Sequence, residues 1–188
     1  MTTPSGLHRC CRHRPLCLAS EGALDNAVFL ALVMSCAPQV DAGTAHALIA
    51  VESGFNPHAI GVVGGVLDRQ PTGRSEAIAT AKALQATGWN FSVGLAQINR
   101  HNFDRLGLTV ESAFEPCINL AAMQKALAEC YERATQRNSA EQRALREALS
   151  CYYSGNFVTG FAHGYVRRVV AARAAQPPST AITSKESS

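Results

Sequence analysis

The sequence lacks several features that would place it in a common functional class. Its most apolar stretch, residues 27–37, is too short to span a bilayer, which takes about 20 residues. Basic residues number 17 against 14 acidic ones and are scattered along the chain, which argues against a nucleic-acid-binding surface. The chain has no HExxH zinc motif, no glycine-rich nucleotide fingerprint and no GxSxG nucleophile elbow. We therefore expect no transmembrane segment, no nucleic acid partner, no metal and no cofactor.

The composition predicts a single, mainly helical domain. The chain has 188 residues, of which 47% are hydrophobic and only 6% aromatic, so it can bury a core of ordinary size. It is rich in alanine and has only short β-branched runs, which favours helix. We expect a basic arm with Cys and His over residues 1–20, a globular domain over 21–175, and a disordered tail rich in Pro, Ser and Thr over 176–188.

Seven cysteines are many for a cytosolic chain of this size, and they indicate an oxidising compartment. Three lie in the N-terminal arm without standard metal-ligand spacing. The other four are Cys36, Cys117, Cys130 and Cys151. If Cys117 and Cys130 share one helix, about 20 Å separates them along its axis, which is too far for a disulfide. Cys117 would then pair with Cys151 or Cys36, unless all four are reduced and buried.

Hydrophobic periodicity and capping residues outline the helices. We interpret the apolar segment 24–36 as the first buried helix, because Glu21 and Asp25 interrupt the approach to it and fit a secretory signal poorly. Ser75 and Ser139 are the expected N-caps of two later helices. The glycines of GVVGG, residues 61–65, predict a flexible loop. The expected helices cover residues 24–36, 41–53, 75–87, 116–136, 139–154 and 161–175.

The segment ALIAVESGFNP, residues 47–57, carries the most informative carboxylate. On a helix, Ala45, Leu48, Ile49 and Glu52 fall at i, i+3, i+4 and i+7, which places Glu52 on the apolar face near the helix C-terminus. Burial and the negative end of the helix dipole both raise the pKa of Glu52. A carboxyl that stays protonated near neutral pH is what a general acid needs to protonate a glycosidic oxygen. Taken alone, the pattern also fits a surface glutamate.

Two further segments extend this pattern: SVGLAQIN, residues 92–99, and CYYSGN, residues 151–156. In this order, the three blocks resemble the soluble lytic transglycosylase family, with a helix ending in Glu-Ser, a Gly-Leu-x-Gln-Ile loop and a Tyr-x-x-Gly turn. The resemblance is closest to the VirB1-like members of type IV secretion systems, because NPHAIGVVGG, AIATAKALQATGWNFSVG and FEPCINLAAM are also similar to that subgroup. It covers roughly residues 24–173.

The resemblance implies a mainly α, lysozyme-like α+β domain with a cleft that binds the glycan strand of peptidoglycan. Members of the family cut the β-1,4 bond between N-acetylmuramic acid and N-acetylglucosamine and leave a 1,6-anhydro end. Glu52 matches the single catalytic acid, which then acts as a base toward the C6 hydroxyl. The family commonly places Asn where this sequence has Tyr153. The residues expected to bind substrate are Ser53, Ser92, Gly94, Leu95, Gln97, Asn99, Tyr152 and Tyr153.

A second catalytic carboxylate is not evident in these motifs. Asp68, Glu76 and Asp104 are available by type, but none lies in a block that resembles a family motif. The acetamido group of N-acetylmuramic acid can stabilise the reacting carbon in place of a nucleophilic carboxylate. The resemblance implies an enzyme of the periplasm or cell envelope of a Gram-negative bacterium, which opens the wall for a type IV secretion or conjugation apparatus. A muramidase on the same fold and a non-catalytic wall-binding protein are the alternatives.

Overall fold

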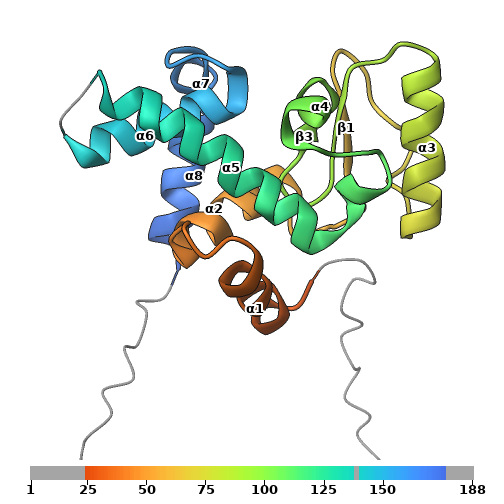
Figure 1. Cartoon of the computed structure of the whole chain (residues 1–188), viewed down its shortest axis with the longest axis horizontal. Coiled ribbons are helices and arrows are strands. Elements are labelled where there is room, and N and C mark those ends of the chain that lie inside the picture. Colours follow the sequence, from red (N-terminus) through yellow and green to blue (C-terminus); the bar gives the residue numbers. More distant parts are fainter. Residues whose placement is uncertain (1–23, 138–139, 177–188) are drawn as a thin grey trace, which may run out of the picture.

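The structure is a computed structural model that describes residues 24–137 and 140–176. Figure 1 shows two lobes: α6, α7 and α8 form one, the small sheet with α3 and α4 forms the other, and the long helix α5 runs between them. The helices are α1 (Asn26–Cys36), α2 (Ala42–Glu52), α3 (Arg74–Ala86), α4 (Phe103–Leu106), α5 (Pro116–Thr135), α6 (Glu141–Ser154), α7 (Thr159–Ala162) and α8 (Tyr165–Ala174), with short 3-10 turns η1 (Arg100–Asn102) and η2 (Ser112–Phe114). The predicted mainly α class is confirmed. None of the helices in these two ranges is both long and apolar enough to cross a bilayer.

A small antiparallel sheet supplies one wall of a cleft of about 810 Å³. Its strands are β1 (Ile60–Val62), β2 (Phe91–Val93) and β3 (Ile98–Asn99), paired in that order. Phe91 and Val93 of β2 are fully buried, whereas Ser92 between them is only partly buried. Because successive residues of a strand point to opposite faces, this alternation turns Ser92 away from the core.

Helix α5 is the central element of the core. Leu120, Met123 and Leu127 recur at helical spacing on its buried face, which packs against α6 and α1. Pro116 occupies the first turn, where its missing N–H leaves no helical hydrogen bond unmade. The predicted helix over 116–136 is therefore confirmed to within one residue.

Three local expectations are wrong. Helix α3 begins at Arg74 after Gly73, so Ser75 is not its cap. The expected helix over 161–175 is two helices, α7 and α8, because Gly164 adopts a left-handed φ of 69° between them. The loop expected at 61–65 begins inside strand β1, where pairing with β2 orders the chain.

Some predictions fall on residues outside the described ranges. These are the whole N-terminal arm 1–20 with its three cysteines, all of the tail except its first residue, and Ser139. Helix α6 begins at Glu141, with Ala140 in the N-cap position. The layout of arm, domain and tail stays a prediction.

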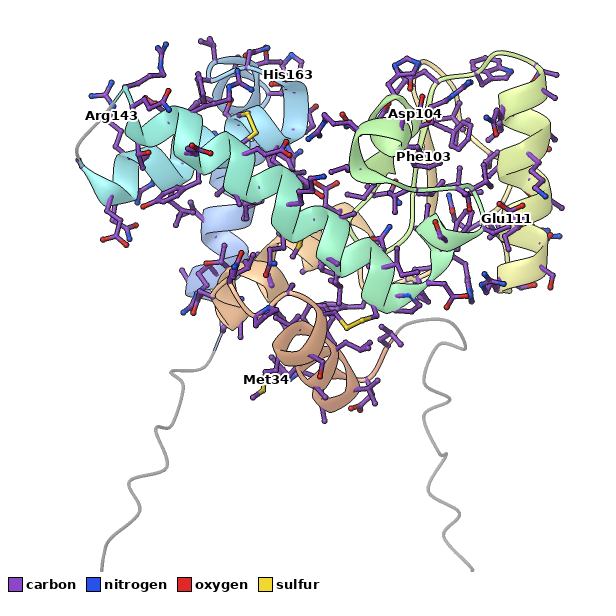
Figure 2. All side chains as sticks on the ribbon, in the orientation of Figure 1. Met34, Phe103, Asp104, Glu111, Arg143 and His163 are labelled. Carbon is purple, nitrogen blue, oxygen red and sulfur yellow. A yellow bond between two sulfur atoms is a disulfide. The ribbon has the colours of Figure 1, made fainter. Side chains whose placement is uncertain are left out.

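Two disulfides fasten α5 to its neighbours. Cys36 of α1 bonds to Cys117 at the start of α5, and Cys130 of α5 bonds to Cys151 of α6, with Cα–Cα distances of 5.2 and 5.7 Å. Both sulfur–sulfur bonds are visible in Figure 2. Cys117 and Cys130 share one helix, as expected, and the choice left open by the sequence is decided in favour of Cys36. The alternative of four reduced thiols is wrong.

Removing either disulfide should lower the free energy of unfolding, and the loss should be larger for the bond that closes the longer loop. The Cys36–Cys117 bond closes 81 residues and the Cys130–Cys151 bond closes 21, so loop entropy predicts losses of about 4.5 and about 3 kcal/mol. The double variants Cys36→Ala/Cys117→Ala and Cys130→Ala/Cys151→Ala serve as controls for each other in urea titrations. A larger loss in the second variant, or a non-reduced digest without the two linked peptides, would contradict these pairings.

Candidate functional site

A cleft of about 810 Å³ lies between the sheet and helices α5 and α6. This volume is in the range of small-molecule sites in proteins. One wall consists of residues from β1, β2, β3 and the chain after them, and the facing wall consists of residues from α5 and the C-terminal turn of α6. The cleft-lining residues that carry polar or charged groups include Glu52, Asn90, Ser92, Gln97, Asn99, Asn102, Arg105, Glu129, Arg133, Tyr152, Tyr153 and Ser154.

Glu52 enters the cleft from the last position of α2. The same helix buries Ala45, Leu48 and Ile49 completely, so the apolar face predicted from spacing is confirmed. Glu52 itself is half-buried. The helix ends there because Ser53 takes the C-cap position, with its N–H bonded to the Ile49 carbonyl.

Burial raises the pKa of Glu52 to about 7. Two smaller effects oppose burial. The Tyr165 hydroxyl donates a hydrogen bond of 2.5 Å to Glu52 Oε1, and the positive charge of Arg168 also favours the carboxylate. Near neutral pH the carboxyl is therefore divided between its acid and base forms, so it can give up a proton and take one back.

Tyr165 is held against Glu52 from several sides. It begins α8, directly after the left-handed Gly164, and its side chain is only 1% exposed. The Tyr153 ring stacks on it with 4.5 Å between ring centroids, and the Tyr153 hydroxyl lies 3.3 Å from His163 Nδ1. The sequence alone assigned no role to Tyr165, because a continuous helix was expected over residues 161–175. The turn at Gly164, which directs Tyr165 toward Glu52, was therefore not predicted.

Asn119 of α5 anchors the loop between β2 and β3. Its Nδ2 donates to the carbonyls of Val93 and Ala113, and its Oδ1 accepts from the Ala96 N–H. Gly94 lies against this buried amide with φ at 77°, and a Cβ there would come within 2.4 Å of Asn119 Nδ2. Only glycine meets both the conformation and the close approach.

The side chains of Gln97 and Tyr152 also form hydrogen bonds that hold this loop. Gln97 adopts a left-handed φ of 47°, and its Nε2 donates to the carbonyls of Ala59 and Gly94. The Tyr152 hydroxyl donates 2.7 Å to the Ala96 carbonyl and so joins α6 to the sheet wall. Burial, followed by the nearby charge of Glu52, raises the pKa of Tyr152 well above its usual value, so its hydroxyl remains a donor.

The structure gathers most of the predicted site residues around one cavity. Ser92, Gln97, Asn99, Tyr152 and Tyr153 line it together with Glu52. The three others, Ser53, Gly94 and Leu95, do not line it.

The remaining candidate carboxylates also lie away from this cavity. Asp68 is exposed, and Glu76 pairs with Arg69. Asp104, which is labelled in Figure 2, lines a different pocket. Across the described ranges, no group of three or more His, Cys, Asp and Glu side chains is arranged to hold a metal ion.

Comparison with known proteins identifies relatives over most of the chain. A family model described as the transglycosylase SLT domain matches residues 29–171. The type IV secretion system protein virB1 of Brucella suis is 53% identical over 149 residues, which cover 76% of this chain and 63% of that protein. The protein virB1 of Agrobacterium fabrum is 38% identical over 167 residues, or 86% of this chain and 67% of that protein.

The chain thus spans less than two thirds of the Brucella relative. No solved structure matches it significantly. The extent of the family match and the two identities nevertheless agree with the mainly helical, lysozyme-like architecture. The chain therefore belongs to the transglycosylase SLT domain family.

Proposed function

We propose that this protein is a peptidoglycan lytic transglycosylase that cleaves the β-1,4 bond between N-acetylmuramic acid and N-acetylglucosamine. The observation that carries the proposal is a half-buried Glu52 whose pKa is raised to about 7 beside a cleft of about 810 Å³. Family membership supports the same reaction class.

Glu52 acts first as the general acid. Its protonated carboxyl donates a proton to the glycosidic oxygen, and the bond from that oxygen to C1 of the muramic acid breaks. The acetamido oxygen at C2 of the same sugar bonds to C1 and takes up the positive charge. N-acetylglucosamine leaves with the proton from Glu52.

Glu52 acts next as the general base. Its carboxylate removes the proton from the C6 hydroxyl of the muramic acid, and O6 attacks C1 while the acetamido oxygen departs. The product is a 1,6-anhydro sugar, and Glu52 ends protonated for the next cycle. Water does not enter the product, which separates this reaction from hydrolysis by a muramidase.

The charge pattern of the cleft supports a single-carboxylate mechanism. Glu129 is the one other carboxylate among the described cleft-lining residues, and it forms an ion pair with Arg105. The contact engages Glu129 Oε2 with the Arg105 guanidinium. The substrate's acetamido group therefore takes the place of a second catalytic carboxylate.

The sheet wall presents neutral polar groups that suit a sugar chain. Ser92, Gln97 and Asn99 offer hydroxyl and amide groups to the hydroxyl and acetamido groups of the strand. Tyr152 and Tyr153 contribute aromatic surface on the facing wall. We assign Ser53, Gly94 and Leu95 a role in the shape of the site. Ser53 caps α2, and Gly94 and Leu95 belong to the loop at residues 94–97.

We further propose a role in the cell envelope, in assembly of a type IV secretion or conjugation apparatus. The Brucella relative is named a type IV secretion system protein. Two disulfides in the folded domain are typical of an oxidising compartment such as the periplasm.

Glu52→Gln should abolish release of anhydro-muropeptides from purified sacculi while the protein still folds.

The wild-type carboxyl has a folded-state pKa above its unfolded value, so its contribution to stability is complete below about pH 4.5 and is lost as pH rises through 7. Gln does not titrate. Relative to wild type, the variant should therefore gain about 1–3 kcal/mol in free energy of unfolding between pH 4.5 and pH 8.

Mass spectrometry of the products tests the reaction type in the wild-type protein. Each released strand end should be lighter by one water than the product of a muramidase. Full activity in Glu52→Gln, or products that contain the added water, would overturn this assignment.

Tyr165→Phe should shift the pH profile of the reaction to higher pH. The variant loses the hydrogen bond that lowers the pKa of Glu52, while burial continues to raise it. The acid form of Glu52 then persists to higher pH, so the decrease in activity on the alkaline side also occurs at higher pH than in the wild type. The maximal rate should drop about tenfold, since the carboxyl also loses its orientation. Tyr131→Phe, which removes a phenol outside the cleft, is the matched control; an unchanged alkaline limb in Tyr165→Phe would contradict this role.

A further inference from the structure

The cleft contains a positive charge that the proposed reaction does not use. The cleft-lining residues of the strands, and Asn90 just before β2, are uncharged and include amides and hydroxyls such as those of Asn90 and Ser92. Apart from the catalytic glutamate, the charged cleft residues are Glu129 and Arg133 of α5 and Arg105 of α4. Arg105 and Glu129 pair with each other. Arg133 forms no ion pair with any carboxylate of residues 24–137 and 140–176.

Arg133 is held in place by contacts that leave its charge uncompensated. Its guanidinium lies over the Phe157 ring, 5.3 Å from the centroid, and its Nη1 lies 3.6 Å from Cys151 Sγ. Arg137 lies over the same ring at 4.9 Å, but it does not line the cleft, and its Nε is 4.0 Å from Glu147. One aromatic ring thus supports two arginines, of which only Arg133 belongs to the cleft.

The chemistry of a guanidinium defines what Arg133 can bind. Its planar set of N–H donors matches a carboxylate, to which it donates two parallel hydrogen bonds. Arg133 is exposed, and its contacts with Phe157 and Cys151 favour one placement of the guanidinium, which reduces the side-chain entropy lost on binding. Hydroxyl and acetamido groups of a sugar chain carry no charge to pair with it.

We propose that Arg133 forms a carboxylate subsite, which binds the acidic substituent on the C3 lactyl ether of N-acetylmuramic acid. This inference rests on the proposed function, because it takes the glycan strand as the ligand of the cleft. The carboxylate comes either from the lactyl group itself or from the peptide attached to it. Such a subsite sets the register of the strand, since only every second sugar carries this substituent, and it discriminates against uncharged polymers of N-acetylglucosamine.

Binding is measured in the Glu52→Gln background, so that the strand is not cut. The probes are glycan strands of one length that either carry stem peptides or have been stripped to the lactyl group by an amidase. Each is used with free carboxylates and with carboxylates converted to neutral amides. Calorimetry compares the four probes on the background protein and on its Arg133→Gln, Arg133→Lys and Arg137→Gln derivatives.

The free-carboxylate form of at least one probe should bind about tenfold more tightly than its neutral form, as for a charge-assisted hydrogen bond. The pair that shows the difference identifies the source of the carboxylate. Arg133→Gln should reduce the ratio to about one, Arg133→Lys should give an intermediate ratio, and Arg137→Gln should retain it.

Equal affinities for free and neutral probes, a ratio that survives Arg133→Gln, or a ratio lost equally in Arg137→Gln overturns the inference. Failure of all four probes to bind overturns it as well. The proposed function is judged separately, by anhydro-product release from the wild-type protein, so the two failures are distinguishable.

Discussion

The contact between Glu52 and Tyr165 is the interaction on which the rest of the site depends. It joins the end of α2 to the start of α8, across 113 residues of sequence, at the edge of the cleft. Burial there raises the pKa of the carboxyl, while the phenol and Arg168 limit the rise. The balance leaves a group that is both acid and base near neutral pH. A more exposed glutamate would be ionised, and a more deeply buried one without a partner would not release its proton.

The sheet wall of the cleft is held in place by side chains that form hydrogen bonds to its backbone. Asn119 and the close approach of Gly94 hold the loop after β2, and Tyr152 ties that loop to α6. Disulfide Cys130–Cys151 joins α6 to α5 one residue before Tyr152. The sheet wall and α6 therefore belong to one connected framework, in which Gly94 and the buried amide of Asn119 keep the cleft-lining loop in position.

The sequence predicted the features that depend on local spacing. The apolar face of α2 and the place of Glu52 on it follow from helical periodicity, and α5 follows from Pro116 and its apolar stripe. The motif residues around the cleft came from the family resemblance. The sequence did not predict contacts between segments that are distant along the chain. Tyr165 reaches Glu52 only because Gly164 breaks the helix, and strands of two or three residues form through pairing that no local pattern encodes. Similarly, geometry within α5 excluded one disulfide but did not choose between Cys36 and Cys151.

Glu52 holds its proton near neutral pH because burial disfavours its charged form. The most direct measurement is a ¹³C NMR titration of the side-chain carboxyl carbon of Glu52, with the signal assigned by its loss in Glu52→Gln. The midpoint is expected near pH 7. A midpoint at about 4.3, the value of a hydrated glutamate, would contradict it.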